Sequence, residues 1–210
     1  MENFQTEEQQ VEAIKSFWSK NGNAVIAGLI IGFSGFIGFN YYQDNKLASE
    51  EAISESYIAL QKKSDDDAYN AEAEEFIKAH SDSSYASLTA LALAKEAVTK
   101  QDWTAAQAQL NTAIDKAVDD GIKAIASLRL ARVQMQTEQF DNALATLNQP
   151  FPSSFLASVE VTKGDTYLLQ GKNELARVAY QIAIDNKGLD TYPNLQMKLD
   201  DLAEVSTLIK

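Results

Sequence analysis

The longest apolar run of the chain lies near its N-terminus, between Ala24 and Tyr42. From Ala24 to Phe39 it contains no charged residue, and Ser34 is its only polar side chain. At about 1.5 Å per residue, a helix over this run is roughly 28 Å long, close to the thickness of a bilayer's hydrocarbon core. It is longer than the apolar core of a signal peptide, and no small-x-small cleavage site stands at the usual place just after it. The pattern predicts an uncleaved transmembrane helix over residues 24–42, with a buried helix of a soluble protein as the alternative.

The residues on either side of this run are typical of a membrane interface. Trp18 precedes it, and Tyr41 and Tyr42 end it, where aromatic belts form. Lys15 and Lys20 favour a cytoplasmic N-terminus, whereas only Lys46 lies close on the other side. We therefore expect one membrane pass, with the N-terminus inside and the C-terminal domain outside.

Two features accompany the predicted anchor. Small residues recur along one side of it, and they form a docking face for another helix or are merely tolerated there: Ala24, Gly28, Gly32 and Gly35. The preceding segment, 1–23, contains an amphipathic pattern that predicts a short helix from Glu7 to Lys20, broken by Asn21-Gly22-Asn23. Such a helix lies on the membrane surface or simply cushions the anchor.

The remainder, 43–210, has a helical pattern throughout, and it predicts an all-α domain of stacked helix pairs. A small residue is followed twelve positions later by alanine three times, as Ala94 and Ala106, Ala131 and Ala143, and Gly164 and Ala176. The second members are 37 and 33 residues apart, the period of tetratricopeptide-like repeats. We expect a degenerate helix pair at 47–80, made of Leu47–Lys63 and Ala68–Ala79 with a break and cap at Ser64–Asp67 between them. Three repeats follow, at about 84–117, 121–150 and 155–187. A C-terminal helix at 193–210 is expected to cover the last repeat.

Close helix crossings explain why small residues recur in these pairs. Alanine or glycine is needed where two backbones approach, and one pair cannot bury its apolar face without a neighbour. Gly171 lies at the turn inside the third repeat, where a left-handed conformation is expected.

Composition removes several classes of function. The 210 residues include no cysteine, so disulfides, thiolate metal sites and cysteine nucleophiles are excluded. The formal net charge is −12, with 16 basic and 26 acidic residues from Gln43 onward. Without a basic stripe that carries aromatic residues, nucleic acid is not an expected partner.

The sequence carries no pattern typical of catalysis, metal or cofactor binding. His80 is the only histidine and has no ligand pattern beside it. Asp65-Asp66-Asp67 lacks the spacing, glycine and terminal glutamate of a calcium loop. Phosphate loops, dinucleotide fingerprints and nucleophile elbows are also missing. A hydrolase would show activity sensitive to His80→Ala, and we expect none.

Protein binding is the function that the repeats favour. The first helices of such pairs line a groove, and some of the positions on their facing side belong to the core instead. Lys95 and Arg132 occupy equivalent positions in two repeats, where they could receive a carboxylate of the partner. The candidate groove residues are Leu88, Leu91, Lys95, Val98, Ile125, Leu128, Arg132, Met135, Ser158, Val161, Asp165 and Leu168.

Two stretches together resemble one known family. They are Gln10-Val11-Glu12-Ala13-Ile14-Lys15-Ser16-Phe17-Trp18-Ser19-Lys20-Asn21-Gly22, before the glycine-rich anchor, and Leu128-Arg129-Leu130-Ala131-Arg132-Val133-Gln134. The chain resembles the ancillary SecYEG translocon subunit family of Gram-negative bacteria over essentially its whole length.

The resemblance implies a single-pass inner-membrane protein with a periplasmic tetratricopeptide-like domain. It implies three kinds of partner: Sec translocon subunits, a membrane-anchored periplasmic chaperone of the peptidyl-prolyl isomerase type, and newly exported polypeptides passed to periplasmic chaperones. A link to envelope-stress regulation also belongs to that family, and no catalytic residue comes with it. The alternative is a structural or regulatory scaffold in envelope assembly that holds one fixed protein partner.

Overall fold

The computed structural model describes residues 7–63 and 68–208, with side chains placed as far as residue 202. This part of the chain is helical and contains no β-strand, which confirms the all-α fold class. It divides into two compact units, Met1–Ile53 and Ser54–Lys210.

A single helix, α1 (Glu7–Gln61), makes up the described part of the first unit and continues into the second. The predicted break at Asn21-Gly22-Asn23 is wrong, because α1 passes through these residues. The Asn21 side chain donates to the carbonyl of Phe17 at 3.2 Å, and the Trp18 indole lies over Gly22, 3.4 Å from where a Cβ would stand. Asparagine and glycine each weaken a helix by only about 1 kcal/mol, and no proline interrupts the hydrogen bonds.

The second unit begins with the last turns of α1, which pack with α2 (Tyr69–Ala79). The Tyr57 ring lies 6.2 Å from Phe76 and 5.0 Å from Tyr85, and Tyr85 Oη donates to Ser54 Oγ at 2.9 Å. The helix expected at Leu47–Lys63 is therefore the C-terminal part of α1. The expected break at Ser64–Asp67 lies outside the described residues.

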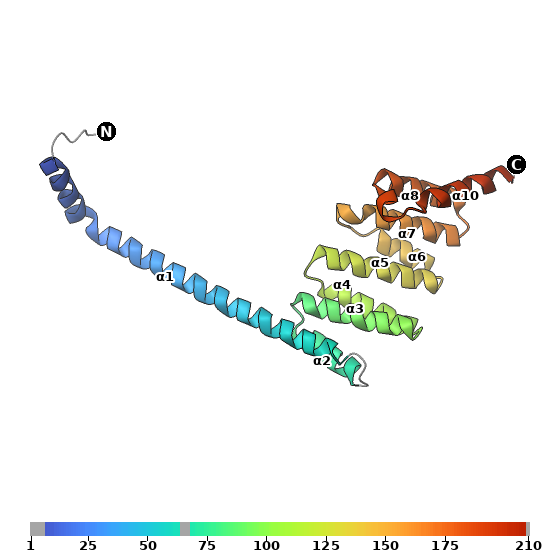
Figure 1. Cartoon of the computed structure of the whole chain (residues 1–210), viewed down its shortest axis with the longest axis horizontal. Helices are drawn as coiled ribbons and strands as arrows, with labels where there is room; N and C mark the ends of the chain where they lie inside the picture. The colour runs from blue at the N-terminus through green and yellow to red at the C-terminus, as the bar shows by residue number, and fades with distance from the viewer. Residues whose placement is uncertain (1–6, 64–67, 209–210) are drawn as a thin grey trace. The chain divides into compact units, whose positions relative to one another are not determined.

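Three antiparallel helix pairs follow in order along the chain (Figure 1). In each pair the expected second alanine, Ala106, Ala143 or Ala176, is fully buried. The 3₁₀ turn η1 (Ser153–Phe155) precedes the third pair. The pairs are α3 (Ser84–Thr99) with α4 (Trp103–Lys116), α5 (Asp120–Gln136) with α6 (Phe140–Leu147), and α7 (Leu156–Leu169) with α8 (Asn173–Asp185).

The same turn joins the two helices of every pair. Gln101, Glu138 and Gly171 have φ values of +58°, +58° and +70°, so the left-handed conformation expected at Gly171 recurs at two other residue types. The following residue donates its N–H back to the helix at 2.8–2.9 Å in all three turns, as Asp102 to Ala97, Gln139 to Gln134 and Lys172 to Tyr167. This is the Schellman closure of a helix C-terminus.

The chain ends with α9 (Gly188–Thr191) and α10 (Leu195–Leu208), and Pro193 lies in the turn before α10. Leu195 and Leu202 of α10 are buried against the third pair, in one cluster with Val161, Ala176 and Tyr180. In this way α10 covers one face of α8, where a further repeat would otherwise stack.

Candidate functional site

A pocket of about 280 Å³ lies between α3 and α5. Leu91 and Val98 of α3 and Val133 of α5 form its apolar wall, and the fully buried Leu110 of α4 lies at its base. The pairing of α3 with α4, and of α4 with α5, positions these side chains, because each pair stacks on the next. The pocket suits an apolar side chain of another polypeptide.

Every ionisable residue that lines this pocket is a cation: Lys95, Arg129 and Arg132. All three are exposed, and none of them forms an ion pair within the described residues. The chain carries a net charge of −12, so a cluster of three unpaired cations is opposite in sign to the charge of the chain as a whole. Sequence analysis singled out Lys95 and Arg132 but missed Arg129, although Arg129 precedes Arg132 by three residues and so shares its helix face.

The structure brings together only part of the candidate groove. Leu91, Lys95, Val98 and Arg132 line the pocket. Leu128 and Val161 are buried in separate core clusters, and Met135 packs against the first of these. Leu88 and Ser158 are half-buried, and Ser158 Oγ accepts from Tyr192 Oη at 3.0 Å. Ile125 and Leu168 are exposed outside the pocket, so these seven residues form no continuous groove with it.

Asp165, the last of the predicted groove residues, is held by two other side chains. Its Oδ1 accepts from Tyr180 Oη and from Lys198 Nζ, both at 2.6 Å. Lys198 Nζ also lies 5.5 Å from the centre of the Tyr180 ring. Burial raises the pKa of Tyr180 well above its usual value, and the hydrogen bond to Asp165 and the charge of Asp165 raise it further. Asp165 therefore fastens α10 to the third pair through these two contacts.

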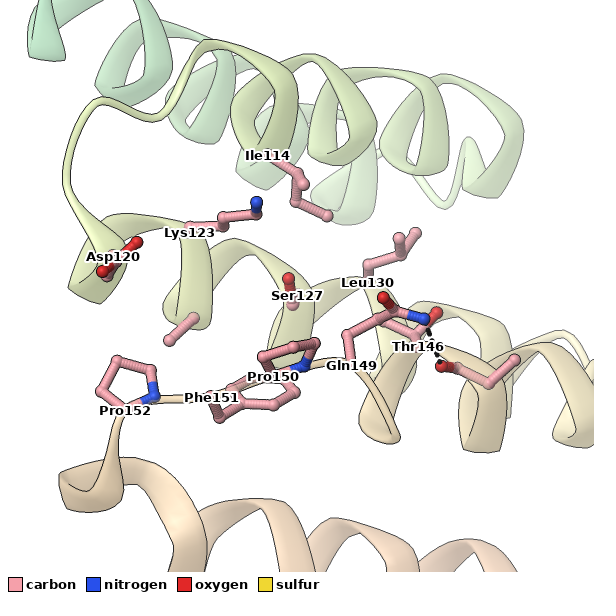
Figure 2. Close-up of a pocket in the computed structure, with 12 residues that line it drawn as sticks. Ile114, Asp120, Lys123, Ser127, Leu130, Thr146, Gln149, Pro150, Phe151 and Pro152 are labelled. Carbon is pink, nitrogen blue, oxygen red and sulfur yellow. Dashed lines mark hydrogen bonds between the residues drawn. The ribbon is translucent and has the colours of Figure 1, made fainter.

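A second, larger cavity of about 720 Å³ lies beside α5 and escaped sequence analysis (Figure 2). Ser127 and Leu130 of α5 line one side, and the loop Gln149-Pro150-Phe151-Pro152 lines another. Figure 2 shows Lys123 and Asp120 at one end of this cavity. Pro150 and Pro152 lie close together and favour an extended loop, and this is the sequence feature that could have indicated the cavity.

The apolar part of α1 presents its side chains to the surroundings on all sides. Its isoleucine, leucine and phenylalanine side chains are all exposed: Ile26, Leu29, Ile30, Ile31, Phe33, Phe36, Ile37 and Phe39. Among the described residues, α1 is the one helix that is long and apolar enough to cross a membrane. A Cβ added at Gly28, Gly32 or Gly35 would meet nothing within 4 Å, so this side of α1 is open.

His80 packs against an aromatic ring in the second unit. Its ring lies 4.6 Å from that of Phe76, at the C-terminal end of α2. Over the described ranges, no group of three or more His, Cys, Asp and Glu side chains is arranged to hold a metal ion.

Comparison with known proteins supplies the family. The model of the tetratricopeptide repeat-like domain family matches residues 15–204. A protein of Haemophilus influenzae named ancillary SecYEG translocon subunit is 34% identical over 93% of this chain and 97% of its own length. The protein of that name in Escherichia coli is 33% identical over 97% of this chain and 100% of its own. This chain belongs to the ancillary SecYEG translocon subunit family.

The similarity extends to a more distant member of the ancillary SecYEG translocon subunit family. The Neisseria gonorrhoeae protein of that name is 30% identical over 93% of this chain and 97% of its own length. No solved structure matches the chain. Because both the apolar helix and the repeats fall inside these matches, the family resemblance drawn from the sequence is confirmed for the whole architecture.

Proposed function

We propose that this chain is a membrane-anchored accessory subunit of the Sec translocon whose repeat domain binds segments of other polypeptides. One observation carries the proposal: a helix with apolar side chains exposed on all sides is joined to repeats that hold an unpaired basic pocket with an apolar wall. Membership of a family whose curated members are named for the SecYEG translocon supports the location.

The proposed orientation places the N-terminus in the cytoplasm and the repeat domain in the periplasm. Lys15 and Lys20 favour the cytoplasmic side for the segment before the membrane helix. In this arrangement α1 anchors the protein in the inner membrane, and the repeats face chains that leave the translocon.

The pocket between α3 and α5 is the proposed binding site. Its apolar wall accepts an apolar side chain, and Lys95, Arg129 and Arg132 attract carboxylates beside it. Anchoring in one membrane raises the effective concentration of both partners, so weak contacts suffice for transient binding.

Transient binding fits a handover role. Newly exported polypeptides would be held briefly and then passed to periplasmic chaperones, among them a membrane-anchored one of the peptidyl-prolyl isomerase type. In the alternative role, as a scaffold for envelope assembly, the pocket would hold one fixed partner.

Co-purification from gently solubilised membranes tests the proposal. Translocon subunits are expected with the unchanged chain, and exported polypeptides should be reduced by the double charge reversal Lys95→Glu with Arg132→Glu. Lys123→Glu, on the same helix as Arg132 but at the other cavity, serves as the matched control and should leave both intact. Consistent absence of translocon subunits, or equal losses in both variants, would contradict the proposal.

A further inference from the structure

The outer face of α8 carries a stripe of large apolar side chains that no described residue covers. Leu175, Val178 and Ile182 are 47%, 57% and 41% exposed. Their spacing of three and four residues places them on one side of the helix. The adjoining face of α8 is closed, because Ala176 and Tyr180 are fully buried beneath α7 and α10.

The other repeats show that the fold does not require this stripe. The equivalent positions are Ala105, Ala108 and Thr112 in the first repeat, and Asn142, Ala145 and Gln149 in the second. These residues are small or polar. At these three aligned positions, large apolar residues therefore occur in the third repeat alone. Exposed apolar patches of this kind mark interaction surfaces.

Charges at the two ends of the stripe indicate what covers it. Lys172 lies before the first turn of α8 and Asp185 at its end, about 20 Å apart along the helix. Both are exposed, and the described part of the chain offers neither of them an ion pair. The other two repeats carry Asp102 with Asp115, and Gln139 with Pro152, at these positions.

The stripe and its charges are complementary to themselves. The midpoint between residues 178 and 179 is also the midpoint of the pair 175 and 182 and of the pair 172 and 185. A second α8, antiparallel and related by a twofold axis at this midpoint, sets Leu175 against Ile182 of the other copy. The same axis sets Lys172 against Asp185 twice, and Val178 lies next to its own counterpart.

We propose that a second copy of this chain docks on the outer face of α8 and forms a twofold-symmetric dimer through Leu175, Val178 and Ile182. Twofold dimers use the same patch on both subunits, which is the property that this stripe has. Anchoring of both copies in one membrane raises their effective concentration, so a small interface suffices. This self-association is separate from the α3–α5 pocket and does not depend on its function.

Cysteine cross-linking of the full chain in its native membrane tests the dimer. The chain has no cysteine, so Val178→Cys introduces a single thiol. Because Val178 lies beside the axis, the two thiols are expected within disulfide reach, and mild oxidation should give a disulfide-linked dimer. Ala108→Cys, the exposed equivalent in the first repeat, is the control and should stay monomeric. Equal dimer yields from the two variants, or adducts of Val178→Cys with other proteins only, would overturn the proposal.

Charge exchange tests the register of the two helices. In the Val178→Cys background, Lys172→Glu or Asp185→Lys alone should lower the dimer yield about three- to tenfold, because each sets like charges opposite one another twice. Both exchanges together should restore the yield. Circular dichroism should show unchanged helix content, since both side chains are exposed. A double variant that dimerises no better than the single variants would overturn the twofold arrangement.

Discussion

The ring of Tyr180 occupies the space that a side chain at position 164 would need. A Cβ built on Gly164 would overlap Cδ1 and Cε1 of Tyr180 and stand 3.0 Å from its Cζ. The first two repeats have Ala94 with Leu110 and Ala131 with Leu147 at the equivalent positions. The third repeat thus combines a smaller residue with a larger one at the same helix crossing.

This pair predicts a coupled response to mutation. Gly164→Ala should destabilise the domain by about 1–3 kcal/mol, because the added methyl group overpacks against the ring. Tyr180→Leu alone should also destabilise it, through lost contacts and the lost hydrogen bond to Asp165. The double variant restores the alanine–leucine pair of the other repeats and should cost at least about 1 kcal/mol less than the two single changes added together. Chemical denaturation of the four proteins measures this, and strict additivity would contradict the packing account.

Glycine at the two other left-handed turns should stabilise the protein. Gln101 and Glu138 have φ of +58°, a conformation that costs a residue with a Cβ about 1–2 kcal/mol. Gln101→Gly and Glu138→Gly should each raise the free energy of unfolding by roughly 0.5–1 kcal/mol after the entropy of the unfolded glycine is counted. Gly171→Ala should lower it, and thermal unfolding compares the three. A loss of stability in both glycine variants would show that the turns are not strained.

The repeat register predicts overpacking at the buried alanines. Ala143 and Ala176 are fully buried where two helices cross. Ala143→Leu or Ala176→Leu should cost about 1–3 kcal/mol, because the added carbons have no space. Ala145→Leu, on the exposed side of the same α6, is the control and should change stability by less than about 0.5 kcal/mol. Unchanged melting temperatures for both buried substitutions would contradict the register.

The pH dependence of stability should reflect Tyr180. Its pKa is raised in the folded protein, first by burial and then by Asp165, whereas the unfolded chain titrates near 10. Below pH 10 the phenol is protonated in both states and its contribution is complete. Above pH 10 the unfolded state ionises first, so this group lowers stability by up to about 1.4 kcal/mol per pH unit.

Tyr180→Phe should therefore flatten the alkaline part of the stability profile. The pKa values of Tyr57 and Tyr69 are also raised by burial, so part of the slope should remain. At neutral pH the variant should lose about 1.5–3 kcal/mol with the hydrogen bond to the Asp165 carboxylate. Urea unfolding at a series of pH values between 7 and 11 measures both effects. An alkaline slope equal to that of the unchanged chain would contradict the assignment to Tyr180.

The sequence could predict those parts of the fold in which the same structural requirement recurs and selects the same type of residue each time. Ala106, Ala143 and Ala176 mark helix crossings, and the period between them located the three pairs. The exposed apolar stretch of α1 was equally readable. The polar and small residues Asn21-Gly22-Asn23 led to the wrong prediction of a helix break. A helix with long helical segments on both sides continues through residues that would end a short helix.

The candidate site was harder to predict, because the residue pattern on a helix face does not determine which other element packs against that face. Leu128 and Asp165 belong to the face expected to line the groove, yet the first packs into the core and the second binds Tyr180 and Lys198. Lys198, one of the two partners of Asp165, is 33 residues away on α10, and no local pattern encodes the contact between these two side chains. Arg129 joins the pocket only because α3 and α5 are neighbours in space.

The central claim is that the pocket between α3 and α5 holds segments of exported polypeptides. A photo-crosslinking residue in place of Val98, on the pocket wall, tests it most directly in living cells, with the same residue at Ala108 on the exposed side of α4 as control. We predict adducts with many different exported polypeptides from position 98, fewer when Arg132→Glu is added, and none above background from position 108. Adducts with one constant protein, or equal adducts from both positions, would contradict the account.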